Sequence, residues 1–292
     1  MEMRDKLLGV SLLSPAVLFF LLLIAYPMLY TFFLSMFKVN TLSLKGEFIG
    51  FGNYIYMLSQ KEFWSSFVTT LIWTASVMTG QVVLGLSVAL ILHGNILFRS
   101  FARGLALFPY LVPTVVAVLV WQWLFNDLYG FLNYFFVKVG LLNKPLAWLA
   151  SMPTAMISLV IVGTWKLFPF VVICVLARLQ TIPEQLYEAA KIDGASAWSR
   201  FWDITMPQLR GVLIMVILLR SIWDFKDFDT PYLLTGGGPQ IGTQTLPLLV
   251  YKHAFPLLNI GRGATVAVLM LVFMLSFFWL YLGAYRKEEA GN

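Results

Sequence analysis

The chain has 292 residues, of which 60% are hydrophobic and 12% are charged, and a soluble domain carries about twice that charged share. So few charges could not cover the surface of a soluble protein, and the composition therefore indicates an integral membrane protein. The net charge of +6 is consistent with the Lys and Arg that membrane proteins carry on cytoplasmic loops, and no run of five like charges predicts a nucleic-acid tail.

Six segments are long and apolar enough to cross a membrane, which takes roughly 20 residues of helix. In chain order they are about 11–37, 67–92, 105–125, 155–177, 211–230 and 263–285. The first segment exceeds the apolar core of a signal peptide, so we expect it to be a retained helix. Because the runs are continuously apolar rather than alternating, they predict an all-α membrane protein with a single transmembrane domain over residues 1–292.

The basic residues predict the orientation of these spans. If the N-terminus is cytoplasmic, the inner segments carry ten Lys and Arg in 58 residues, and the outer segments carry seven in 90. Seven arginines fall inside and one, Arg262, falls outside. Because short cytoplasmic loops are enriched in Lys and Arg, we expect both termini to be cytoplasmic.

The residue counts argue against disulfide, metal and nucleotide chemistry in this chain. Cys174 is the one cysteine, and neither His93 nor His253 has a Cys or Glu at metal-ligand spacing. Gly237 and Gly242 are the nearest approach to a phosphate-binding loop, but the lysine that would reach the phosphates is missing. We therefore expect no metal site and no catalytic residues, and any ATP would be bound by another subunit.

The longest predicted cytoplasmic loop begins at Thr181, and its sequence predicts two short helices joined by a glycine. Thr181 and Glu184 fit a capping box at the start of the first helix. Gly194 can adopt the left-handed conformation that ends a helix. A second, aromatic-rich short helix is predicted from Ser196, and Pro207 starts the return into the membrane.

Several residues of this loop, 181–207, occur at a distinctive spacing: Glu188, Ala189 and Ala190, then Gly194, then Ile204 and Pro207. This pattern resembles the EAA loop of the membrane subunits of binding-protein-dependent ABC importers. The family pattern has leucine before the proline where this chain has Met206, a change that keeps an apolar side chain.

A second stretch narrows the resemblance. It contains Phe225-Lys226-Asp227-Phe228-Asp229, Leu233-Leu234-Thr235-Gly236-Gly237-Gly238-Pro239, Thr243, Thr245 and Ala254-Phe255. It is similar to the outer loop before the last helix of carbohydrate-uptake permeases of the maltose and glycerol-phosphate type. Pro27 and Phe51-Gly52-Asn53-Tyr54 near the start fit the same family, so the resemblance covers nearly the whole chain.

The resemblance implies a type I ABC importer permease fold with six spans and a coupling helix that docks on a separate ATPase. Glu188 would contact a basic group of that ATPase, the small Ala189 and Ala190 would allow close approach, and Gly194 would supply the turn. The candidate coupling residues are Glu188, Ala189, Ala190, Asp193, Gly194, Ile204 and Pro207. A solvated surface helix is the alternative interpretation of this loop.

Polar and aromatic residues within the spans are the candidates for the transport path. Lys166 lies near the middle of the fourth span with no acidic neighbour one turn away, whereas Arg220 and Asp224 are spaced to pair with each other, which favours a structural role. The path candidates are Lys166, Trp165, Trp223, Asp224, Asp227 and Trp121. The tryptophans could instead form an interface belt, and Lys166 could instead snorkel outward.

The outer-loop turn Gly236-Gly237-Gly238-Pro239 is the candidate contact for the binding protein, with a plain loop as the alternative. We expect the chain to form half of the pathway for a sugar, oligosaccharide or sugar derivative, by alternating access in a bacterial or archaeal cytoplasmic membrane. The resemblance implies as partners a second permease subunit, two ATPase subunits that bind ATP and Mg²⁺, and a solute-binding protein.

Three alternatives stay open at this point. The solute could be a non-sugar such as glycerol phosphate. A secondary transporter would need ion-coupling groups in repeated halves, and the sequence has no internal repeat. A membrane enzyme would need a polar cluster at one membrane face; Asp224, Asp227 and Asp229 are the nearest approach, and no histidine accompanies them.

Overall fold

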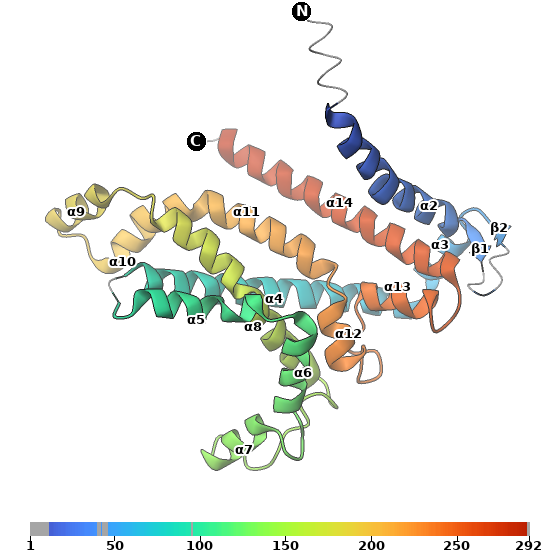
Figure 1. The fold of residues 1–292 in the computed structure, drawn as a ribbon, viewed down its shortest axis with the longest axis horizontal. Helices are drawn as coiled ribbons and strands as arrows, with labels where there is room; N and C mark the ends of the chain where they lie inside the picture. The colour runs from blue at the N-terminus through green and yellow to red at the C-terminus, as the bar shows by residue number, and fades with distance from the viewer. Residues whose placement is uncertain (1–11, 40–41, 43–45, 95, 291–292) are drawn as a thin grey trace, which may run out of the picture. The chain divides into compact units, whose positions relative to one another are not determined.

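A computed structural model describes residues 12–39, 42, 46–94 and 96–290, with side chains up to residue 283. Helices dominate it (Figure 1), which confirms the all-α prediction. One short hairpin departs from that class: β1 (Phe37–Val39) pairs antiparallel with β2 (Gly46–Phe48). Arg4, Lys6 and Lys45, as well as the side chains of Arg286 and Lys287, which all count toward the predicted orientation, lie outside the described residues.

Among the described residues, five helices are long and apolar enough to span a membrane, and a bent pair, taken as one span, makes a sixth. The spans are Leu12–Ser35, α4 (Lys61–His93), the pair α5 (Arg99–Leu111) and α6 (Thr114–Leu124), α8 (Thr154–Leu179), Ala197–Phe225 and Ile260–Gly283. They follow the six predicted segments in order. The predicted continuous third span is wrong, because α5 and α6 meet at an angle of 95°.

The helices and helix segments not yet labelled include parts of these spans. They are η1 (Leu21–Ala25), α2 (Tyr26–Ser35), α3 (Gly52–Ser59), α7 (Phe131–Lys138), α9 (Glu184–Ile192), α10 (Ala197–Arg200), η2 (Phe201–Thr205), α11 (Met206–Phe225), α12 (Asp229–Thr235), α13 (Leu246–Ala254) and α14 (Ile260–Ala290). The labels η1 and η2 mark π-helical turns inside longer helices.

The chain divides into two compact units, so the single domain over 1–292 stays a prediction. The first unit consists of residues 1–64 and 249–280, and the second of residues 65–248 and 281–292. Asn53 organises the first unit, because its side-chain amide donates to the carbonyls of Ser35 and Phe37, each at 2.9 Å. The Phe-Gly-Asn-Tyr turn thus fixes the end of the first span.

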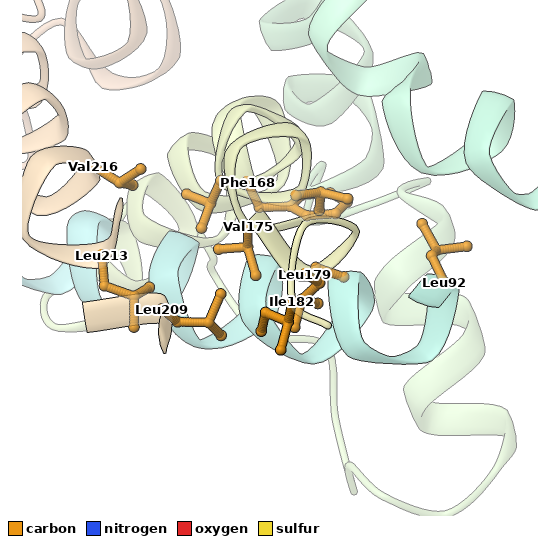
Figure 2. Packing of buried hydrophobic residues seen from close by; sticks show 11 residues of the cluster. Leu92, Phe168, Val175, Leu179, Ile182, Leu209, Leu213 and Val216 are labelled. Atoms are coloured by element: carbon orange, nitrogen blue, oxygen red, sulfur yellow. The ribbon is translucent and has the colours of Figure 1, made fainter. Parts of the chain in front are cut away.

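The second unit has its main hydrophobic core where α4, α8 and α11 meet. Figure 2 shows this cluster, which includes Leu92, Phe168, Val175, Leu179, Ile182, Leu209, Leu213 and Val216. Glycines bring α4 and α8 into close contact: a Cβ added to Gly85 would lie 2.5 Å from Val171 Cβ, and one added to Gly163 would lie 2.6 Å from Trp73. Small residues are the usual means of tight helix packing in membranes.

Candidate functional site

The first helix of the loop begins later than the capping box predicts. Pro183 occupies the N-cap of α9 and makes no side-chain cap hydrogen bond. Thr181 Oγ1 donates instead to the Arg178 carbonyl at 2.8 Å. The capping-box prediction is therefore wrong, because the carbonyls at the end of α8 compete successfully for the threonine hydroxyl.

The glycine turn after α9 is confirmed. Gly194 has φ +77°, in the left-handed region that favours glycine. Gly194 N donates to the Lys191 carbonyl at 3.1 Å, and Ala195 N donates to the Ala190 carbonyl at 2.8 Å. These bonds satisfy the last carbonyls of α9, so the helix ends in a defined direction.

The second loop helix is longer than predicted. α10 starts at the Ser196 N-cap, whose Oγ accepts from Ser199 N at 3.1 Å, but the helix then runs on through η2 into α11. Residues 197–225 form one helix of 29 residues. Ile204 and Pro207 lie inside this helix, and the π-helical turn η2 ends just before Pro207, which accommodates its missing N–H. The predicted separation of a short helix from the fifth span is wrong.

The base of α9 is tied to the core of the second unit. Tyr187 Oη and Thr205 Oγ1 are 3.0 Å apart, and Arg178 Nη2 donates to Gln208 Oε1 at 2.7 Å. Ile182, just before α9, is buried in the main core. The Tyr187 contact joins α9 to the start of the fifth span, and the Arg178 contact joins the end of α8 to the same segment.

The rest of α9 is open. Glu188, Ala189, Asp193 and Gly194 are exposed, and Ala190 is half-buried. Ile192 is 86% exposed, although it is a large apolar residue. A rigid surface helix with small residues and exposed apolar side chains is suited to docking against another protein.

A cavity of about 370 Å³ lies within the second unit. It is lined by Thr114 of α6, Lys166 and Leu167 of α8, Arg220, Trp223 and Asp224 of α11, and Lys226, Asp227, Phe228, Asp229 and Thr230. The structure thus brings together four predicted path residues: Lys166, Trp223, Asp224 and Asp227. Trp121 and Trp165 are not among its lining residues. Their rings pack against each other, with centroids 5.6 Å apart.

Arg220 and Asp224 form the predicted ion pair, which is fully buried. Arg220 Nε also donates to Gln81 Oε1 at 2.6 Å, and Gln81 Nε2 donates to the Gly163 carbonyl at 3.2 Å. Trp73 Nε1 donates to the Asp224 carbonyl at 3.0 Å. Because these bonds link α4, α8 and α11, the pair has a structural role. Sequence reasoning missed Gln81, since an isolated polar residue in a span does not reveal its partners.

Lys166 finds its partners on the broken third span. Its side chain is 7% exposed, and Nζ donates to the carbonyls of Pro109 at 3.0 Å, Tyr110 at 3.2 Å and Val112 at 2.5 Å. The alternative in which it snorkels outward is therefore wrong.

Trp223 and Asp227 border the same cavity. Trp223 is 39% exposed and packs on Phe170 with ring centroids 5.3 Å apart. Asp227 lies beyond the end of the fifth span and is half-buried; burial raises its pKa, an effect that the hydrogen bonds from Thr230 oppose and the neighbouring Asp229 carboxylate reinforces. An aromatic face beside carboxylates can contact both the C–H surface and the hydroxyls of a polar solute.

The outer-loop turn is more ordered than a plain loop. Gly236 is exposed with φ +60°, whereas Gly237 is buried with φ +91°. Thr235 and Thr243 close the turn through hydroxyls 2.7 Å apart. Gly238 and Pro239 are half-buried, so Gly236 is the most accessible of the four predicted contact residues.

Comparison with known proteins identifies the class. A family model described as binding-protein-dependent transport system inner membrane component matches residues 81–287. The chain is 36% identical over 290 residues to the trehalose/maltose transport system permease MalF of Thermococcus litoralis, covering 99% of this chain and 97% of that protein. It is 33% identical over 290 residues to the sulfoquinovosyl glycerol permease SmoG of Agrobacterium fabrum, covering 99% and 94%.

A solved structure matches the fold. The crystal structure of a bacterial ABC transporter that imports the acidic polysaccharide alginate gives a TM-score of 0.81 at 19% identity, covering 97% of this chain and 96% of that chain. The fold is therefore that of a type I ABC importer permease, as predicted. The chain belongs to the family of binding-protein-dependent transport system inner membrane components. It is thus a transport permease subunit by family, which favours the importer over the secondary-transporter alternative.

Proposed function

We propose that the chain forms half of the translocation pathway of an ATP-driven importer for a sugar, an oligosaccharide or a sugar derivative. The relatives named above are permeases for trehalose or maltose and for sulfoquinovosyl glycerol, and these names support a carbohydrate solute. The cavity beside Trp223 and Asp227 suits a hydroxyl-rich solute, since it combines an aromatic face with hydrogen-bond acceptors.

The exposed helix α9 is the observation that carries the proposal. In it Glu188 and Ala189 face solvent, while its base is bonded to the start of the fifth span through Tyr187 and Thr205. A partner ATPase, which would bind ATP and Mg²⁺, docks on α9 from the cytoplasm. Its closure on ATP moves the loop as a rigid body, and the loop moves the fifth span.

The remaining parts of the proposed assembly follow from the same mechanism. A second permease subunit, expected to be a different chain, completes the pathway, and both termini of this chain are cytoplasmic. A loaded solute-binding protein docks on the outer side, where Gly236 offers exposed backbone. Solute then passes between the two permeases as access alternates from one side to the other.

The test is co-purification from native membranes with Glu188→Lys and Gly194→Val variants. Glu47→Lys is the matched control, because it makes the same charge reversal on the exposed strand β2. We expect an ATPase and a second permease with the wild type and the control, and a several-fold loss of the ATPase with both loop variants. Equal recovery from all four proteins would contradict the proposal. The co-purified binding protein is then titrated with trehalose, maltose and glycerol phosphate. If it binds glycerol phosphate alone, the proposed solute is glycerol phosphate and not a sugar.

A further inference from the structure

The third span is broken beside the cavity. α5 ends at Leu111, α6 begins at Thr114, and the two axes differ by 95°. Pro113 has no N–H, so it cannot donate to the carbonyl four residues earlier, at Pro109. A carbonyl left without a donor inside a membrane protein is costly, so a break at this position needs another donor.

Lys166 supplies that donor. Its ammonium has three protons and no acceptor, and three carbonyls around the end of α5, those of Pro109, Tyr110 and Val112, lie 2.5–3.2 Å from Nζ. A positive charge at the C-terminal end of a helix is also stabilised by the helix dipole. The carbonyls at the break need a hydrogen-bond donor, and the buried Lys166 ammonium needs acceptors. The helix break and the buried charge therefore stabilise each other.

We propose that Lys166 is a positioning residue that holds the third span bent and thereby sets one wall of the cavity. Lys166 and Thr114, the first residue of α6, both line that cavity. Because backbone carbonyls occupy all three ammonium protons, Lys166 has no N–H left to donate to a solute in this arrangement. The consequence for transport rests on the proposed function, whereas the bend itself does not.

The bend is measured directly by spin labels on the intact protein, with Cys174→Ala as background. Labels replace Phe101 on α5 and Trp123 on α6, which are 73% and 54% exposed. A straight helix would separate these positions by about 33 Å, and a right-angle bend by about 23 Å. We expect the short distance in the wild type and in Lys166→Arg, and a shift of several ångströms toward the long distance in Lys166→Met. An unchanged distance in Lys166→Met would overturn the proposal.

A suppressor separates the bend from general destabilisation. Pro113→Ala restores an N–H that can donate to the Pro109 carbonyl. Combined with Lys166→Met, it should recover thermal stability while the label distance stays long. Pro169→Ala is the control, because it adds an N–H to α8 and none to the break. Recovery by both proline variants, or by neither, would count against the carbonyl contacts as the cause.

Uptake measured in proteoliposomes with the partner subunits links the bend to transport. We expect Lys166→Arg to keep most of the uptake rate, and the stabilised double variant Lys166→Met/Pro113→Ala to lose at least tenfold. Retained uptake in the double variant would overturn the link between bend and cavity. Absence of ATP-driven uptake in the wild type would overturn the proposed function and leave the distance result standing.

Discussion

Gln81 is the residue that ties the buried ion pair to its surroundings. It accepts from Arg220 at 2.6 Å and donates to the Gly163 carbonyl of a neighbouring helix. A single-residue change therefore disturbs three helices. The same residue shows the limit of sequence reading: the spacing of Arg220 and Asp224 predicted their pairing, but the third partner lies 139 positions away from Arg220 in the sequence.

We expect Gln81→Leu to destabilise the folded protein by about 1–3 kcal/mol, because the buried guanidinium loses an acceptor. Thermal unfolding in detergent measures the loss. Ser87→Ala is the control, since Ser87 is on the same helix and its hydroxyl donates to the Val83 carbonyl of that helix at 2.7 Å. Equal unfolding temperatures for Gln81→Leu and wild type would show that another acceptor replaces the amide.

His253 in α13 gives the first unit a pH dependence. Burial lowers its pKa from the ordinary 6.5, and the Glu62 carboxylate only partly opposes that shift. The folded chain therefore binds this proton less tightly than the unfolded chain. The resulting stability is complete above pH of about 6.5 and is lost as pH falls toward the lowered pKa. We expect unfolding temperatures measured between pH 7.5 and 5 to fall less steeply for His253→Gln than for wild type. Parallel curves would refute the assignment.

At the scale of elements, the apolar runs predicted all six spans, because run length alone decides whether a helix can cross a membrane. The break in the third span was not predictable. Prolines occur in several of these spans, so a proline alone does not mark a break. Pro113 differs because Lys166, 54 to 57 positions later in the sequence, binds the carbonyls of Pro109 and Val112 just before it. The capping box failed for a similar reason, since the competing carbonyl of Arg178 belongs to the preceding helix.

Contact between α4 and α8 depends on Gly85. A methyl group there would meet Val171 Cβ at 2.5 Å, so Gly85→Ala should cost about 1–3 kcal/mol through overpacking. Gly104→Ala is the matched control, because Gly104 lies in α5 with nothing within 4 Å of the added carbon. The control should be neutral or slightly stabilising, since alanine favours a helix over glycine. Chemical denaturation of both variants checks this, and an equal effect would refute close packing at Gly85.

At the scale of the whole molecule, the family could be predicted because it rests on residue identity at fixed spacing, whereas the coupling role of loop 181–207 stays a prediction. The continuity of the loop with the fifth span could not be predicted, because a proline such as Pro207 usually signals a helix start, and nothing in the sequence indicates the π-helical turn before it. The structure resolves this, since the π-turn η2 carries the helix from Arg200 into α11 without a gap.

The continuous helix predicts a coupling variant. Ile204→Gly combined with Thr205→Gly should make η2 flexible, since each glycine disfavours helix by about 1 kcal/mol. We expect ATP hydrolysis to persist in the assembled transporter, while the ratio of solute transported to ATP hydrolysed falls several-fold. Leu141→Gly combined with Leu142→Gly, after α7, is the control and should leave that ratio unchanged. An unchanged ratio in the η2 variant would show that the loop acts through another element.

Under the proposed coupling mechanism, the 29-residue helix at residues 197–225 would also act as a lever. At 1.5 Å per residue it is about 43 Å long, so a tilt of about 10° applied at its loop end would displace the opposite end by about 7.5 Å. That displacement exceeds one helical pitch. Trp223 and Asp224 sit at the far end of this arm, on the cavity wall. If the proposed ATPase docks on α9, a small rotation there would displace the cavity wall by about the width of a sugar ring.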